Sequence, residues 1–196
     1  MTRQAEAFWI PTPEEVQEEM HRVKVQERFN RTLKSTFGTV LVVAAIAVLV
    51  AVIILPVLRV TGTTMQPNFL PGDILVSYKT DRFDRGEICT FYYNNKLIVK
   101  RVIALGGDTV DISEDGRVSV NGKTLDEPYV EQYAFGQCDI ELPFEVPLGQ
   151  MFLLGDNRET SVDSRNTDFG CITTEEVLGK VFLRVWPLDS FRFFGL

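Results

Sequence analysis

The chain has 196 residues, 45% of them hydrophobic, and a formal net charge of −7 at pH 7. This length is enough for one compact domain with an appendage. The acidic balance argues against a nucleic-acid partner, which a basic surface would attract. A four-ligand zinc site would need the single histidine, His21, together with all three cysteines, at spacings that match no familiar zinc motif. We therefore expect neither a metal nor another cofactor.

The N-terminal part of the sequence predicts a charged helix. An apolar patch at residues 8–10 is followed by Thr12, Pro13 and Glu15, which fit a capping box with Pro13 as the first helical residue. The apolar positions that follow form only a thin stripe. We expect a solvated stalk that leads to the membrane, with a docking helix as the alternative.

Residues 37–58 contain no charged side chain over 22 positions. At about 1.5 Å per residue, a helix of this length spans the roughly 30 Å hydrocarbon layer of a bilayer. A buried core helix does not need so long an apolar run, and a strand rarely reaches this length. A cleavable signal peptide is disfavoured because the run is too long and no small-residue cleavage motif follows it. We expect a permanent membrane anchor.

The charges on either side of the anchor predict its orientation. Residues 22–34 contain five basic side chains and one acidic one, whereas Arg59 is the only basic residue between the anchor and Lys79. The positive-inside rule then places residues 1–36 in the cytoplasm, 37–58 in the cell membrane and 59–196 outside. The outer segment has 14 basic and 21 acidic side chains, so it holds all of the excess negative charge.

The outer segment predicts a mainly β, antiparallel domain with long loops. Runs rich in β-branched and aromatic residues predict strands at 74–78, 88–93, 97–105, 110–113, 117–120, 151–154 and 181–186. Asn94-Asn95 and Asn121-Gly122 predict tight hairpin turns. Helical periodicity is nearly absent, apart from a possible turn at 173–178.

The outer segment has no histidine, so its inventory excludes Ser-His-Asp and Cys-His catalysis there. A lysine or a pair of carboxylates is then the candidate base. Lys100 shares a predicted strand face with Ile98, Val102 and Ala104, and burial among them would lower its pKa and supply neutral amine near pH 7. The alternative, which the strand pattern alone favours, is a lysine at a sheet edge with its head in water.

Two loop clusters add further candidates. Residues 61–67 (TGTTMQP) can present a hydroxyl nucleophile and a backbone N–H to an oxyanion, or can form a plain juxtamembrane turn. Residues 155–165 alternate carboxylates and arginines so densely that we expect a buried ion-pair network. An acid–base dyad of Asp156 and Asp163 is a weaker candidate, because the neighbouring arginines would keep both carboxylates ionised.

In this order behind an N-terminal span, these segments resemble the type I signal peptidases, which are membrane-anchored Ser/Lys proteases that remove signal peptides from exported proteins. The resemblance covers roughly residues 37–187, and the string at 155–165 is its most specific part. The matching motifs are Met65-x-Pro67, Gly72-Asp73, the strand around Lys100-Arg101, Gly107-Asp108, Asn121-Gly122, Glu127-Pro128-Tyr129, Gly155-Asp156-Asn157-Arg158, Ser161-x-Asp163-Ser164-Arg165, Gly179-Lys180 and Trp186-Pro187.

The resemblance implies a role for each matching site residue. Lys100 would be the general base, and Ser161 would orient its amine through a hydroxyl. The residues that would form structural salt bridges around the site are Arg101, Asp156, Asp163 and Arg165. It also implies a β-rich catalytic domain whose apolar surface lies against the outer leaflet of the lipid bilayer. The partners would be signal peptides of exported preproteins, bound as extended segments with small residues before the scissile bond, near the secretion translocon.

The nucleophile departs from the family pattern, because Thr64 stands where the family has serine before the methionine. Threonine supplies the same hydroxyl, but its methyl group restricts χ1. A register shift that makes Thr63 the nucleophile stays open, and Asn68 replaces a frequent threonine. Two functions follow: an active peptidase that uses Thr64 and Lys100, or a catalytically silent chaperone or assembly factor that binds exported segments. Retention of Lys100, Ser161 and the arginine–carboxylate string favours the first.

The cysteines permit one more prediction. An extracytoplasmic location allows disulfides, and Cys138 and Cys171 lie in loop-like sequence, so a bridge between them is an open possibility. Cys89 lies in a predicted strand and should pack as a small hydrophobe.

Overall fold

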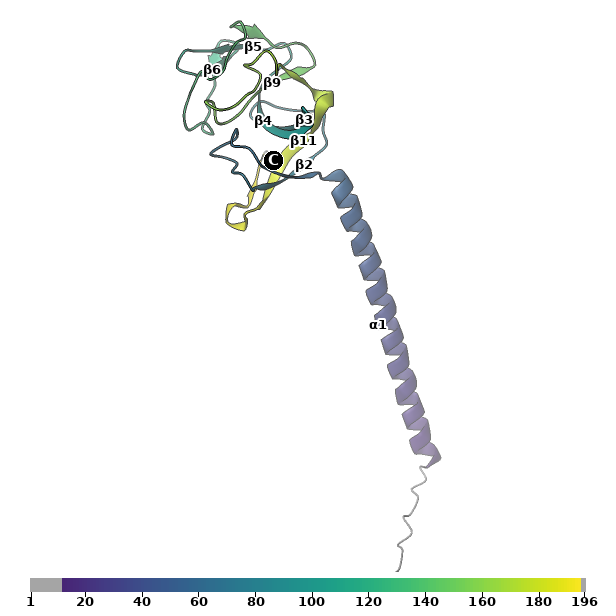
Figure 1. Cartoon of the computed structure of the whole chain (residues 1–196). Coiled ribbons are helices and arrows are strands. Elements are labelled where there is room, and N and C mark those ends of the chain that lie inside the picture. The colour runs from purple at the N-terminus through teal and green to yellow at the C-terminus, as the bar shows by residue number, and fades with distance from the viewer. Residues whose placement is uncertain (1–11, 195–196) are drawn as a thin grey trace, which may run out of the picture. The chain divides into compact units, whose positions relative to one another are not determined.

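The computed structural model describes residues 12–194, which divide after Val50 into a helical unit and a β-rich unit. Helix α1 (Pro13–Ile54) is one continuous helix of 42 residues (Figure 1). It begins at the predicted Pro13, and the apolar patch at residues 8–10 lies outside the described residues. In the part of the chain that the structure describes, α1 is the one helix long and apolar enough to cross a membrane, over Val16–Ala51.

Helix α1 ends four residues before the predicted end of the apolar span at Leu58. Pro56 has no N–H to donate into a helix, and the chain continues there as strand β1 (Val57–Arg59), which pairs antiparallel with β2 (Ile74–Tyr78). Leu58 is buried in the same hydrophobic cluster as Met65, in the core of the β-rich unit. The apolar run therefore contains both a long helix and the first core strand.

The β-rich unit consists of two antiparallel sheets, so the predicted fold class is confirmed (Figure 1). The larger sheet has the strand order β1-β2-β11-β3-β4-β9-β10 with β12 beside β11, and the smaller one has the order β7-β6-β5-β8. The remaining bounds are β3 (Ile88–Tyr93), β4 (Lys96–Leu105), β5 (Thr109–Ile112), β6 (Val118–Val120), β7 (Lys123–Thr124), β8 (Phe144–Glu145), β9 (Gln150–Leu154), β10 (Ile172–Thr173), η1 (Thr174–Glu176), β11 (Val177–Trp186), η2 (Leu188–Ser190) and β12 (Arg192–Phe193).

The predicted hairpin turns are confirmed by their backbone conformations. Asn94 and Asn95, between β3 and β4, have φ values of 48° and 61°, and Asn121 and Gly122, between β6 and β7, have 54° and 75°. These left-handed conformations match the twist of two-residue hairpins, which explains the choice of Asn and Gly. The predicted turn at 173–178 is the short 3₁₀ helix η1.

Strand β4 supplies the base and one wall of the site. It pairs with β3 from Lys96 to Arg101, whereas β9 joins its other edge only from Arg101 onward. A bulge between Val102 and Ala104 interrupts the side-chain alternation, so these two residues pack in different hydrophobic clusters. The predicted common face of residues 98–104 is therefore wrong beyond Val102.

Candidate active site

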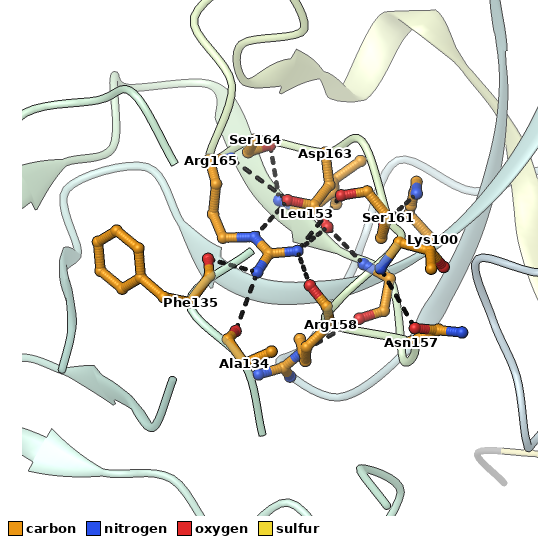
Figure 2. A network of polar contacts seen from close by, with 12 residues as sticks. Lys100, Ala134, Phe135, Leu153, Asn157, Arg158, Ser161, Asp163, Ser164 and Arg165 are labelled. Atoms are coloured by element: carbon orange, nitrogen blue, oxygen red, sulfur yellow. Dashed lines mark hydrogen bonds and ion pairs between the residues drawn. The ribbon is translucent and has the colours of Figure 1, made fainter. Parts of the chain in front are cut away.

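The side chain of Lys100 lies inside the protein with only 1% of its surface exposed. Its Nζ donates a hydrogen bond to the Ser161 Oγ at 2.5 Å (Figure 2). Across the β3–β4 pair, the residue opposite Lys100 is Cys89, which is fully buried in the core. The alternative of a sheet-edge lysine with its head in water is therefore wrong.

Burial lowers the pKa of Lys100 from 10.5 to about 8. The charge of Asp163 raises this pKa, Arg165 lowers it and Asp156 raises it, but the loss of hydration outweighs these neighbours. About one tenth of the amine is then neutral at pH 7, whereas a pKa of 10.5 would leave less than about one part in a thousand. The site thus contains an amine that can accept a proton at neutral pH.

The Thr64 backbone lies close to Ser161, the hydrogen-bond partner of the Lys100 amine. Thr64 is half-buried in the turn after β1, and its carbonyl accepts a hydrogen bond from the Asn157 N–H at 3.0 Å. Gly155 lies between the Thr64 carbonyl and the Ser161 hydroxyl. A Cβ at Gly155 would be 2.5 Å from the Thr64 carbonyl oxygen and 2.2 Å from the Ser161 Oγ. Within residues 12–194, no hydrogen bond joins the Thr64 hydroxyl to the Lys100 amine.

Two buried ion pairs surround Lys100, as the dense alternation of charges predicts. Arg101 donates two hydrogen bonds to Asp156, at 2.7 and 2.6 Å. Arg165 donates to both carboxylate oxygens of Asp163, at 2.8 and 3.0 Å. Figure 2 shows the Arg165 guanidinium beside Asp163, and the N–H groups of Arg165 also bond to backbone carbonyls of Ala134, Phe135, Arg158 and Ser161.

A third buried pair was not predicted from the sequence. Arg158 binds Glu127 through hydrogen bonds of 2.5 and 3.2 Å, and its side chain is 1% exposed. Both residues stand in the motifs quoted above, but their pairing spans 31 positions and depends on how the loops pack. The position of Arg158 within a string of alternating charges was the one available signal.

A cleft of about 460 Å³ runs beside Thr64, between the chain after β1 and the start of β4. Its walls come from residues 59–62, 64–65 and 96–99, which include apolar residues, two threonines and the basic residues Arg59 and Lys96. Gln66 and Pro67, from the same loop, line a second hollow of about 250 Å³ together with Asp156 and Asn157. A buried amine that is about one tenth neutral at pH 7, together with hydroxyl groups near a cleft, supplies the groups that a hydroxyl/lysine hydrolase requires.

The cysteines take no part in this arrangement. All three are free thiols, so the structure contains no bridge between Cys138 and Cys171. Cys89 packs in the core as predicted, and burial raises the pKa of its thiol to about 12. Among the described residues, no three His, Cys, Asp or Glu side chains are grouped as metal ligands.

Comparisons with known proteins identify the family of this chain. The family model for signal peptidase, peptidase S26, matches residues 33–186. Signal peptidase IB of Staphylococcus aureus (strain MRSA252) is 35% identical over 154 residues, which cover 68% of this chain and 79% of that protein. Signal peptidase I of Bacillus caldolyticus is 37% identical over 150 residues, with coverages of 68% and 81%. The chain therefore belongs to the signal peptidase family, peptidase S26.

A solved structure, a signal peptidase I from Enterococcus faecalis V583, shares 30% sequence identity with this chain. The superposition covers 50% of this chain and 96% of that one, with a TM-score of 0.42. The family assignment rests on the sequence comparisons.

Proposed function

We propose that this protein is a membrane-anchored signal peptidase in which Thr64 is the nucleophile and Lys100 is the general base. It removes signal peptides from exported preproteins, as the family and the names of its relatives support. The observation that carries the proposal is the buried Lys100 amine bonded to Ser161, whose hydroxyl lies across Gly155 from the Thr64 carbonyl. A silent chaperone has no need of a desolvated lysine, whose burial costs stability.

The first chemical step is acylation of Thr64. Its Oγ attacks the scissile carbonyl carbon while the hydroxyl proton passes to the neutral Lys100 Nζ. The Thr64 N–H donates no hydrogen bond within the described chain, so it is available to stabilise the oxyanion. When the C–N bond breaks, the Lys100 ammonium returns the proton to the departing amine.

The second step releases the signal peptide. Lys100, neutral again, takes a proton from a water molecule, and the hydroxide attacks the ester carbonyl on Thr64. Ester cleavage returns a proton to the Thr64 oxygen and frees the new carboxylate. Ser161 holds the amine in place through both steps by its 2.5 Å hydrogen bond.

The substrate binds as an extended segment in the cleft beside Thr64. The edge of β4 before Arg101 carries no β9 partner, so its N–H and C=O groups can pair with a substrate backbone. The chain after β1 forms the opposite wall of the cleft. Main-chain pairing explains how one cleft accepts many sequences, with small side chains required next to the reacting carbonyl.

We also propose the orientation that the flanking charges predict. Residues 1–36 lie in the cytoplasm, the anchor lies within residues 37–58 and its helix ends at Ile54, and the chain from β1 onward acts outside the membrane, next to the translocon from which preproteins emerge. Apolar helix α1 supports the anchor. Protease treatment of intact spheroplasts tests the orientation: the β-rich unit is degraded from outside if the proposal holds and is protected if the orientation is reversed.

Cleavage of a purified preprotein by the full chain in lipid vesicles tests the activity. Wild type and Thr64→Ser should release the mature protein, whereas Thr64→Ala and Lys100→Ala should not. Thr63→Ala is the matched control and should retain cleavage. A wild type that cleaves no more than Thr64→Ala would refute the peptidase and favour the silent binding protein.

A further inference from the structure

Asn68 lies four residues after Thr64, in the same loop, and its side chain links two other segments. Its Nδ2 donates to the Asp156 Oδ2 at 2.9 Å and to the Tyr129 carbonyl at 2.6 Å. Both partners are acceptors, so the amide orientation is fixed by its contacts. An amide nitrogen has two protons and uses one for each bond, which a hydroxyl with a single proton cannot do.

These contacts form part of a closed ring of four side chains. Asn68 binds Asp156, Asp156 binds Arg101 through two hydrogen bonds, and the Arg101 guanidinium lies 3.9 Å from the centre of the Tyr129 ring. The second Asn68 hydrogen bond returns to the Tyr129 backbone and closes the ring. Four segments of the chain therefore meet at this ring, and Asn68 is the residue by which the loop that contains Thr64 contacts it.

Two members of the ring, Arg101 and Asp156, are close in sequence to residues that hold or contact the reacting groups. Arg101 follows Lys100 directly in β4, and Asp156 precedes Asn157, whose N–H holds the Thr64 carbonyl. The backbone carbonyl of Asn68 accepts a hydrogen bond from the Arg184 guanidinium, with an N···O distance of 2.7 Å. The ring thus connects the loop that contains Thr64 to the strand that contains Lys100.

We propose that Asn68 is a positioning residue, which sets the distance between the Thr64 hydroxyl and the Lys100 amine by fixing the nucleophile loop to the Asp156–Arg101 pair. This inference rests on the peptidase function proposed above. A displacement of about 1 Å between reacting groups costs on the order of a hundredfold in rate, so loss of this contact should slow the chemistry more than it weakens substrate binding.

The test compares variants of the full chain in lipid vesicles. Asn68→Ala should lower kcat at least about tenfold with KM within about twofold, because the cleft walls do not include Asn68. Asn68→Thr keeps one hydrogen-bond donor and is included in case Asn68→Ala does not fold. Its kcat should lie between those of Asn68→Ala and wild type. The pH midpoint of Asn68→Ala should stay that of wild type, since the base keeps its surroundings.

A matched control exists in the smaller sheet. The Asn121 Nδ2 donates to Asp108, which pairs with Arg85, so it repeats the Asn–Asp–Arg arrangement away from Lys100. Asn68→Asp and Asn121→Asp both remove a donor and place carboxylate against carboxylate. Both should lower the unfolding temperature, but only Asn68→Asp should lower kcat.

The outcomes separate the two proposals. If Lys100→Ala is inactive and Asn68→Ala keeps its kcat within twofold of wild type, the positioning role is wrong and the peptidase stands. An equal kcat loss in Asn121→Asp would also overturn positioning, because destabilisation alone would explain both. If Lys100→Ala cleaves as well as wild type, the proposed mechanism fails and the positioning role fails with it.

Discussion

Gly155→Ala should abolish signal-peptide cleavage while leaving the protein folded. A Cβ at this position would be 2.2 Å from the Ser161 Oγ and 2.5 Å from the Thr64 carbonyl oxygen, against 3.4–4 Å for ordinary contacts. The neighbours must move by about 1 Å, which costs on the order of a hundredfold in kcat for groups that react with each other. Overpacking of this kind costs about 1–3 kcal/mol of stability.

Gly106→Ala is the matched control. Its Cβ would be 2.8 Å from the Gly149 nitrogen and 2.9 Å from the Pro147 oxygen, in a turn that contains no proposed site residue. Both variants should lower the unfolding temperature of the full chain, measured by circular dichroism. Only Gly155→Ala should lose preprotein cleavage; retention of more than half of the wild-type kcat would refute the close packing of Thr64 against Ser161.

Three further predictions follow from buried charges. Because Lys100 must be neutral, kcat/KM should fall about tenfold per pH unit below pH 8, and a flat profile down to pH 6 would exclude a lysine base. Since the unfolded state binds this proton more readily, Lys100 should add up to about 3 kcal/mol of stability between pH 8 and 10.5, measured as the difference between wild type and Lys100→Met across that range. Glu127→Gln should lower the unfolding temperature by about 10 °C by leaving Arg158 buried without a countercharge; an unchanged temperature would contradict this pairing.

Much of the fold follows from local sequence patterns. The strands around Lys100 and both asparagine turns could be predicted because alternation and positive φ are local properties. Strand β1 could not, since its residues continue the apolar run of the helix and only Pro56 separates them. The bulge in β4 was also invisible, because it arises from the register of pairing with β9.

The sequence predicted which residues form the site, but not which of them contact each other. The absence of histidine from residues 59–196 pointed to a lysine such as Lys100 or to a pair of carboxylates, and the dense charges at 155–165 pointed to buried ion pairs. The Arg158–Glu127 pair and the contact of Asn68 with Asp156 join residues 31 and 88 positions apart, so only the packed loops reveal them. Whether the lysine head lay in water or inside the protein also depended on tertiary packing.

The central claim is that Thr64 carries the acyl group and Lys100 accepts its proton. Acid quenching during preprotein turnover, followed by digestion of the full chain and mass spectrometry, locates the acyl-enzyme directly. The account predicts a signal-peptide fragment esterified to Thr64 in the wild type and no such adduct in Lys100→Ala. Cleavage with the acyl group on Thr63 or Ser161, or with no adduct on any residue, would contradict it.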